Sequence, residues 1–128
     1  MKWFFKILVL SILLQSFQCT DANNVSDDVT SAQLETKKQE IQNYIKSFGC
    51  SESAGCSFIA FGSKPCGGPW SYLVFSNSVN LTKLEEMVKD YNEMNKLYNI
   101  QTNAISDCSI PSPPNEIKCV NGVCTIIN

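Results

Sequence analysis

Seven cysteines in a chain of 128 residues constrain the fold more than any other feature of this sequence. One cysteine follows an apolar N-terminal run, and six lie further along the chain, namely Cys50, Cys56, Cys66, Cys108, Cys119 and Cys124. An even set in a small exported chain indicates a disulfide framework, whose pairing the sequence does not determine. A domain of about 100 residues buries only a modest core, and each disulfide contributes about 2–4 kcal/mol. We therefore expect one small, disulfide-stabilised domain.

Residues 1–18 have the pattern of a secretory signal peptide. Lys2 and Lys6 supply a positive start, and the run from Ile7 to Leu14 is apolar except for Ser11. This run is shorter than the roughly 20 residues of a membrane-spanning helix, and polar, acidic sequence follows it. We expect export into a compartment where disulfides form.

Cys19 stands where a bacterial lipoprotein carries its acylated cysteine, directly after the leader. Ser16, Phe17 and Gln18 lack the small-x-small pattern of ordinary cleavage, although Gln18 also departs from the small residue usual before a lipid cysteine. Residues 19–29 resemble the acidic tether of bacterial surface lipoproteins and cannot order themselves. We expect an outer-membrane lipoprotein facing the periplasm or the cell surface. Free secretion is the alternative.

The charge of the mature chain excludes several classes of partner. Without residues 1–18 it has eight Lys, twelve Asp or Glu, no Arg and no His, a net charge of 8 − 12 = −4. Such a chain lacks the basic patch of nucleic-acid-binding proteins. It is not attracted to anionic lipid, so we expect contact with a membrane only through a lipid anchor.

Apolar periodicity predicts helices over residues 31–48 and 81–98, and short apolar runs predict strands over 58–61 and 72–75. Toward its end the second helix is expected to be weakened by three asparagines, Asn92, Asn95 and Asn99. The elements indicate an α+β domain over residues 30–128, with two helices packed on a small antiparallel sheet and stapled by disulfides.

The dipeptide Asn121-Gly122 predicts a hairpin within residues 117–126, because its turn needs two positive φ angles. In that register Cys119 faces Cys124. Two arrangements are open. The two cysteines bond each other, or each ties the hairpin to another part of the chain, such as Cys108 or the Cys50–Cys66 segment.

Residues 62–71 are the best candidate for a binding site, because loops held by a rigid scaffold carry binding. Their prolines and glycines exclude helix and regular strand, and Cys66 can brace them. The candidate residues are Lys64, Gly67, Gly68, Trp70 and Tyr72, whose aromatic rings can stack on a sugar or anchor a protein. In the alternative interpretation Trp70 is a core residue and Gly67-Gly68 a tight corner. The expected partner is an extracellular protein or glycan.

Catalysis and metal binding find little support in the sequence. The absence of His removes His-assisted proteases and His-containing zinc hydrolase sites. Only Cys119 and Cys124 have a spacing close to that of zinc ligands, so we expect no metal and no cofactor. The leading hypothesis is a non-enzymatic surface binding module. The alternatives are a secreted protease inhibitor with Lys64 as bait, which Pro65 disfavours, and a small carboxylate-dependent enzyme.

Three local motifs recur together in a known group of sequences. They are Pro65-Cys66-Gly67-Gly68-Pro69-Trp70 followed by Tyr72-Leu73-Val74, then Ser106-Asp107-Cys108, and finally Cys119-x-Asn121-Gly122-x-Cys124. The chain resembles a family of small exported cysteine-rich bacterial proteins over about residues 50–124. The resemblance implies the limits of the domain and a location in the cell envelope. It implies no activity and no catalytic residues.

Intact mass spectrometry of the protein from its native host tests these expectations. We expect the mass of an acyl group on Cys19 and a gain of about six daltons on reduction, because three disulfides take up six hydrogens. A lipid-free chain with free thiols would contradict both the anchor and the disulfide framework.

Overall fold

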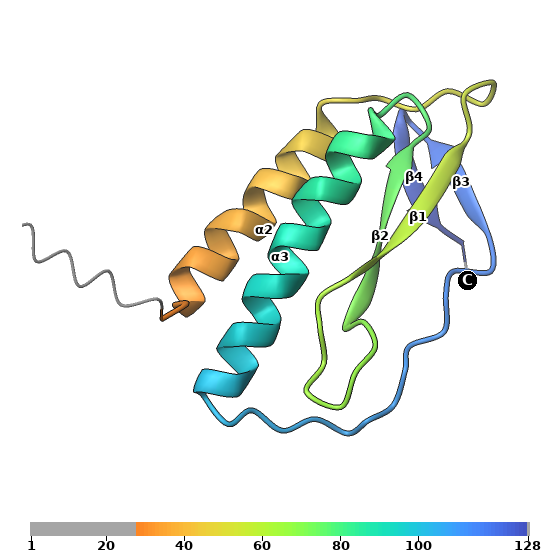
Figure 1. Ribbon diagram of the computed structural model, residues 1–128. Helices are drawn as coiled ribbons and strands as arrows, with labels where there is room; N and C mark the ends of the chain where they lie inside the picture. Colours follow the sequence, from red (N-terminus) through yellow and green to blue (C-terminus); the bar gives the residue numbers. More distant parts are fainter. Residues whose placement is uncertain (1–27, 128) are drawn as a thin grey trace, which may run out of the picture.

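Two helices and four strands follow one another along residues 28–127, the part of the chain that the computed structural model describes (Figure 1). The elements are α2 (Ser31–Lys46), β1 (Cys56–Phe61), β2 (Ser71–Ser76), α3 (Leu81–Gln101), β3 (Ile117–Val120) and β4 (Val123–Ile126). This order confirms the predicted α+β class. The predicted signal peptide, Cys19 and nearly all of the predicted tether lie outside the described residues.

Both helices begin at a residue whose side chain satisfies free backbone donors. The Thr30 hydroxyl accepts from the Gln33 N–H, and the Gln33 side chain accepts from the Thr30 N–H, which together form a capping box. Asn80 caps α3 by accepting from the Lys83 N–H. The helix α3 extends beyond its predicted end to Gln101. Neither described helix is long and apolar enough to cross a membrane.

The core lies between the helices and one face of the β1–β2 hairpin. The two strands are antiparallel, with Ile59 opposite Leu73. Because side chains alternate along a strand, one face of this hairpin points to the helices. The buried core consists of Ile41, Phe61, Phe75, Val79, Leu84 and Val88. Figure 1 shows α2 and α3 side by side, with the strands on one side of the pair.

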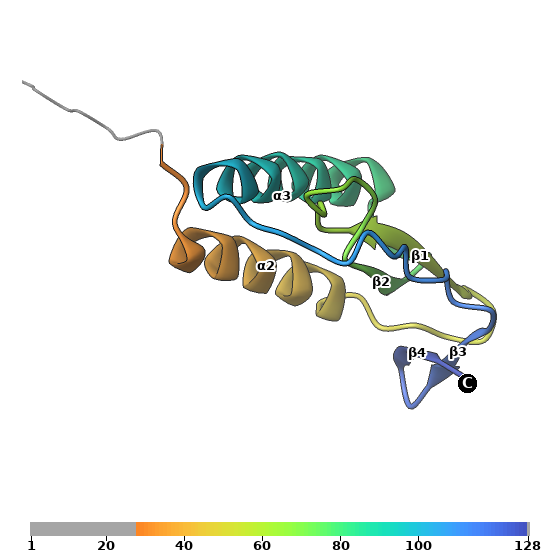
Figure 2. The ribbon, with the colours of Figure 1, turned by 90° about the horizontal axis from the view of Figure 1, so that it is seen from below.

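The four strands form two separate two-stranded sheets instead of one. Seen from below, the β3–β4 hairpin lies beyond β1–β2, on the side away from α3 (Figure 2). Cys56 has the opposite strand parity to Ile59 and Phe61, so its side chain projects from the outer face of the sheet. Its bond to Cys124 therefore holds the second hairpin over that face and not in line with the strand edge.

The described cysteines form three disulfides, Cys50–Cys119, Cys56–Cys124 and Cys66–Cys108. Cys119 and Cys124 are directly opposed in the hairpin, as predicted, but each bonds a cysteine elsewhere in the chain. Of the two arrangements left open by the sequence, the direct Cys119–Cys124 bond is therefore wrong, and bonding to separate partners is confirmed. The bonds span 42 to 69 residues, so the loop-closure model assigns each about 4 kcal/mol.

Candidate functional site

A groove of about 630 Å³ runs beside the start of β2. One wall is formed by residues 70–72, the second by residues 111–116 of the connector before β3, and the end is closed by residues 126–127 of the C-terminal hairpin. The structure thus brings Trp70 and Tyr72 of the predicted site together with two segments that are distant in sequence. Neither segment was predicted from the sequence to belong to a site.

Trp70 presents an aromatic side chain to this groove. It is 44% exposed, so it is not the core residue of the alternative interpretation. Its backbone N–H donates to the Phe61 carbonyl, 3.0 Å away, where the β1–β2 hairpin begins to open into the loop. The indole packs closely on Gly62, where an added Cβ would lie 2.8 Å from Trp70 Cδ1. Gly62 is therefore required for the position of the ring, and its φ of 83° also favours glycine.

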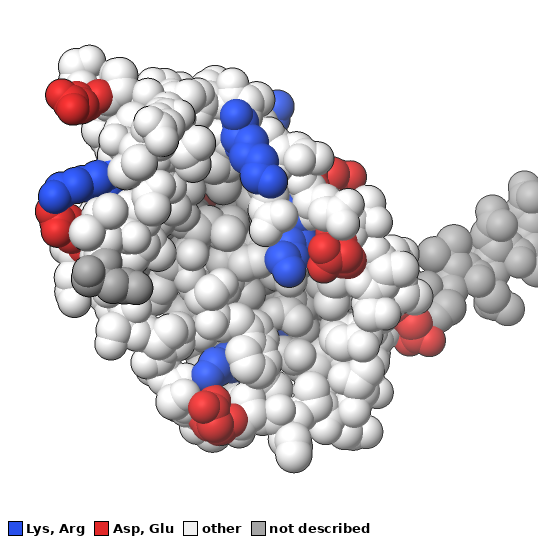
Figure 3. Space-filling view, turned by 180° about the vertical axis from the view of Figure 1, so that it is seen from behind, with Lys and Arg blue, Asp and Glu red and all other residues white. Residues whose placement is uncertain are grey.

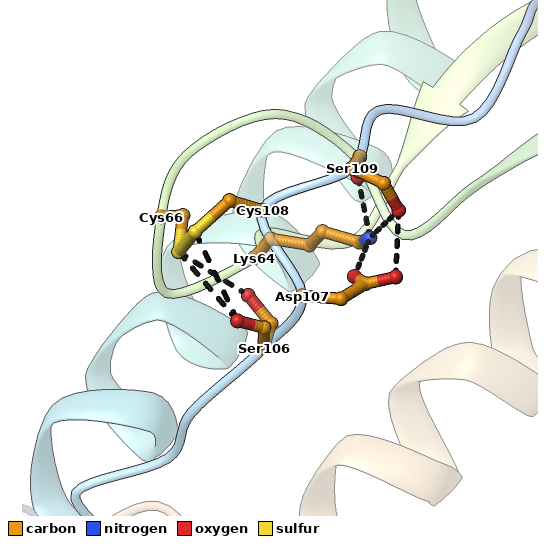
Figure 4. The surroundings of a disulfide bond; sticks show 6 residues. All are labelled: Lys64, Cys66, Ser106, Asp107, Cys108 and Ser109. Carbon is orange, nitrogen blue, oxygen red and sulfur yellow. Dashed lines mark hydrogen bonds and ion pairs between the residues drawn. A yellow bond between two sulfur atoms is a disulfide. The ribbon is translucent and has the colours of Figure 1, made fainter.

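Lys64 belongs to the loop, is only 8% exposed, and extends its side chain toward Asp107 and Ser109 of the connector (Figure 4). Its ammonium donates to Asp107 Oδ1 at 2.8 Å and to the carbonyl of Ser109. It also lies over the Trp70 ring, 5.0 Å from the centroid. All of these contacts are internal, so Lys64 is not presented to a partner. The reason is that the buried ammonium is paired with the exposed carboxylate of Asp107 on the connector, which offsets the cost of its burial.

Gly67 and Gly68 form the tip of the loop and do not line the groove. They have φ angles of 92° and 81°, and the loop is closed by a bond from the Lys64 N–H to the Gly68 carbonyl. The two glycines therefore make the tight corner of the alternative interpretation. Next to them the disulfide Cys66–Cys108 ties the tip to the connector, as drawn in Figure 4.

Three asparagines of α3 hold the base of the loop through its backbone. Asn92 Oδ1 accepts from the Gly62 N–H at 2.7 Å, and Asn95 Oδ1 accepts from the Ser63 N–H at 2.8 Å. Asn99 Nδ2 donates to the Ser63 carbonyl at 2.6 Å. These residues were expected to weaken the helix, but each finds a partner in the loop. Their spacing of three and four residues places them along one helical face, and this is the sequence pattern that indicates a shared partner.

The proline-rich connector supplies the wall opposite Trp70. Pro111 and Pro114 are partly buried, and both belong to the lining of the groove. Proline fixes φ near −65°, so this wall changes shape little. The connector is anchored to the hairpin where the Ile127 N–H donates to the Glu116 carbonyl at 3.0 Å.

Metal ligands and catalytic carboxylates do not converge on this groove. The sulfur atoms of Cys50, Cys56 and Cys124 lie within 4.8 Å of one another, but each is part of a disulfide and offers no thiolate to a metal. Asp90 and Glu93, the carboxylate pair that shares a helical face, are exposed on α3. Among the described residues that line the groove, Glu116 alone carries a carboxylate.

This chain matches no protein-family model, no curated protein and no solved structure. The resemblance to small exported bacterial proteins is not tested by these comparisons and stays a prediction. The geometry of the groove is therefore the basis for the function proposed below.

The substitution Asn95→Ala tests the role of the α3 asparagines. It leaves the Ser63 N–H without its acceptor. Asn95 is only 7% exposed, so the loss occurs in a largely buried place. We expect the free energy of unfolding, measured by urea denaturation, to fall by about 1–3 kcal/mol. The control Asn43→Ala, at an exposed position of α2, should change it by less than about 0.5 kcal/mol. Equal stabilities of the two variants would contradict this role.

Asp107→Asn tests the contact between Lys64 and the connector. Hydrogen bonds from Lys64 and Ser109 hold the pKa of the Asp107 carboxyl below its ordinary value. Such a group stabilises the fold above its unfolded-state pKa of about 3.9, and this stability is lost as the pH falls through the folded-state pKa. Between about pH 7 and about pH 3 the wild type should lose more stability than Asp107→Asn. Asp90→Asn, at an exposed position of α3, should follow the wild type. Parallel curves for wild type and Asp107→Asn would refute the contact.

Proposed function

We propose that this protein is a non-enzymatic binding module on the outside of the bacterial cytoplasmic membrane, and that it holds its ligand in the Trp70–Tyr72 groove. The observation that carries the proposal is a concave surface with a half-exposed tryptophan, formed by segments that are fixed in place. Sites of this kind combine apolar and aromatic surface with a few polar groups.

Preorganisation of the groove supports a binding role. The loop before Trp70 is fixed by the Cys66–Cys108 disulfide and by the asparagines of α3. The opposite wall is fixed by its prolines. A surface that is already ordered before binding loses little conformational entropy when the ligand arrives, so more of the contact energy appears as affinity.

The same proposal includes an anchor at Cys19 that places the domain at the cell surface or in the periplasm. The three disulfides support an oxidising compartment, since such bonds persist outside the cytoplasm. With the domain beginning near Thr30, the intervening residues 19–29 would separate the groove from the membrane. Free secretion is the alternative location.

The two other candidate functions have weaker support. An inhibitor with Lys64 as its bait residue needs an exposed Lys64 side chain, and that side chain is nearly buried. A carboxylate-dependent enzyme needs two acids facing one enclosed cavity. Glu85 and Glu93 both line a shallow hollow beside α3, but both are exposed and Lys89 pairs with Glu93. Of the described residues that line the groove, only Glu116 has a carboxylate, and Lys118 pairs with it at 2.8 Å.

A fragment screen observed by protein NMR tests the groove without knowledge of the natural ligand. The probes are methyl glycosides of neutral and acidic monosaccharides together with N-acetyl amino-acid amides. We expect chemical-shift changes at the Trp70 indole N–H and at neighbouring groove residues. Trp70→Ala should abolish them, and Leu97→Ala, at an exposed position of α3 outside the groove, should leave them unchanged. Fragments that bind elsewhere, or none that bind, would contradict the proposal.

A further inference from the structure

We infer that the ligand of this groove is a neutral glycan chain, bound with a sugar ring stacked on Trp70. This inference rests on the proposed binding function and goes further by naming the chemical class of the ligand. The inference is based on three features of the groove. They are the position of the indole ring, the polar groups around the ring and the charge of the lining.

The indole ring of Trp70 is held in one position by its neighbours. The Lys64 ammonium lies over the ring at 5.0 Å from its centroid, and the Gly62 backbone is packed against the ring atoms. These contacts limit the rotation of the side chain, while 44% of the residue stays exposed. The apolar C–H face of a sugar can therefore stack on the ring at a small cost in side-chain entropy.

The polar groups of the groove match the hydroxyl groups of a sugar. Tyr72 and Ser112, which line the groove, carry hydroxyls, and Asn115 carries an amide. Hydroxyl and amide groups both donate and accept hydrogen bonds, as sugar hydroxyls do. The volume of about 630 Å³ falls within the range of roughly 300–1,000 Å³ typical of ligand pockets, which gives room for a short stretch of a glycan.

The charge of the groove favours a neutral ligand over an acidic one. No lysine is among the described residues that line it, and its single carboxylate, on Glu116, is paired with Lys118. On the face of the molecule seen in Figure 3, several lysine and acidic side chains lie next to one another in separate groups, with uncharged surface between the groups. A uronate, sialate or phosphate group would find no lysine in the lining to offset the loss of its hydration, and the neighbouring Lys118 is already paired with Glu116.

A peptide is a poorer fit than a glycan because of the wall opposite Trp70. Peptides that bind in extended form gain affinity from main-chain hydrogen bonds to a strand or strand-like wall. Pro111, Pro113 and Pro114 have no N–H, so this wall cannot supply the regular ladder of donors that such a peptide needs. A glycan can stack on the aromatic ring and bond to the hydroxyls without a row of main-chain hydrogen bonds.

Affinity electrophoresis of the full-length protein in native gels tests the inference. The gels contain neutral polysaccharides (a β-glucan, a galactomannan, an arabinoxylan or starch) or acidic ones (polygalacturonate, alginate or hyaluronan). We expect at least one neutral polysaccharide to retard the protein and the acidic ones not to do so. Trp70→Ala should weaken the retardation about tenfold or more, as the loss of an anchoring aromatic side chain does.

The control variant is Leu97→Ala, which removes an exposed apolar side chain of α3 outside the groove and should be retarded like the wild type. Urea denaturation of both variants checks that each is folded. Retardation by acidic polysaccharides alone, or retardation that Trp70→Ala does not change, would overturn the inference. If no polysaccharide retards the protein while amino-acid amides shift the groove signals by NMR, the glycan is refuted and the binding function stands. If no fragment shifts the NMR signals of the groove residues either, both proposals fail.

Discussion

The disulfides Cys50–Cys119 and Cys56–Cys124 hold the C-terminal hairpin over the outer face of the β1–β2 sheet, and the groove depends on this placement. The hairpin is too short to bury a core of its own, since two isolated strands are marginally stable in water. Once it is fixed, its last residues close one end of the groove, and the preceding prolines are drawn across from Trp70. The covalent bonds thus substitute for the apolar contacts that a larger domain would use.

Polar contacts and a disulfide hold the loop that carries Trp70. Its base is bonded to the side chains of α3, its tip is tied by a disulfide, and the Lys64 ammonium joins it to Asp107 of the connector. Buried polar groups of this kind are costly unless they are paired, and among the described residues no buried side-chain polar atom lacks a partner. The loop is therefore specified as one conformation, which is what a preorganised site requires.

The candidate site shows where reasoning from the sequence succeeded and where it stopped. The aromatic residues Trp70 and Tyr72 were identified, and both line the groove. Lys64 was grouped with them as a loop residue that could act as the bait of a protease inhibitor, a role that needs an exposed side chain, but it is buried. Its burial depends on Asp107, which is 43 residues away in the chain, and no local sequence pattern predicts that pairing. Gly67 and Gly68 were also predicted to belong to the site, but they form the tight corner of the loop.

By itself the sequence determined the two helices, the strands over 58–61 and 72–75, the C-terminal hairpin and the number of disulfides. Apolar periodicity, the Asn121-Gly122 turn and cysteine parity are local or compositional signals. Only the tertiary structure decided the pairing of the cysteines, the division of the strands into two sheets and the wall opposite Trp70. These features depend on contacts between residues far apart in the chain. Short-range patterns do not contain them, since many pairings have equally good local geometry, and the packing of the whole domain selects one.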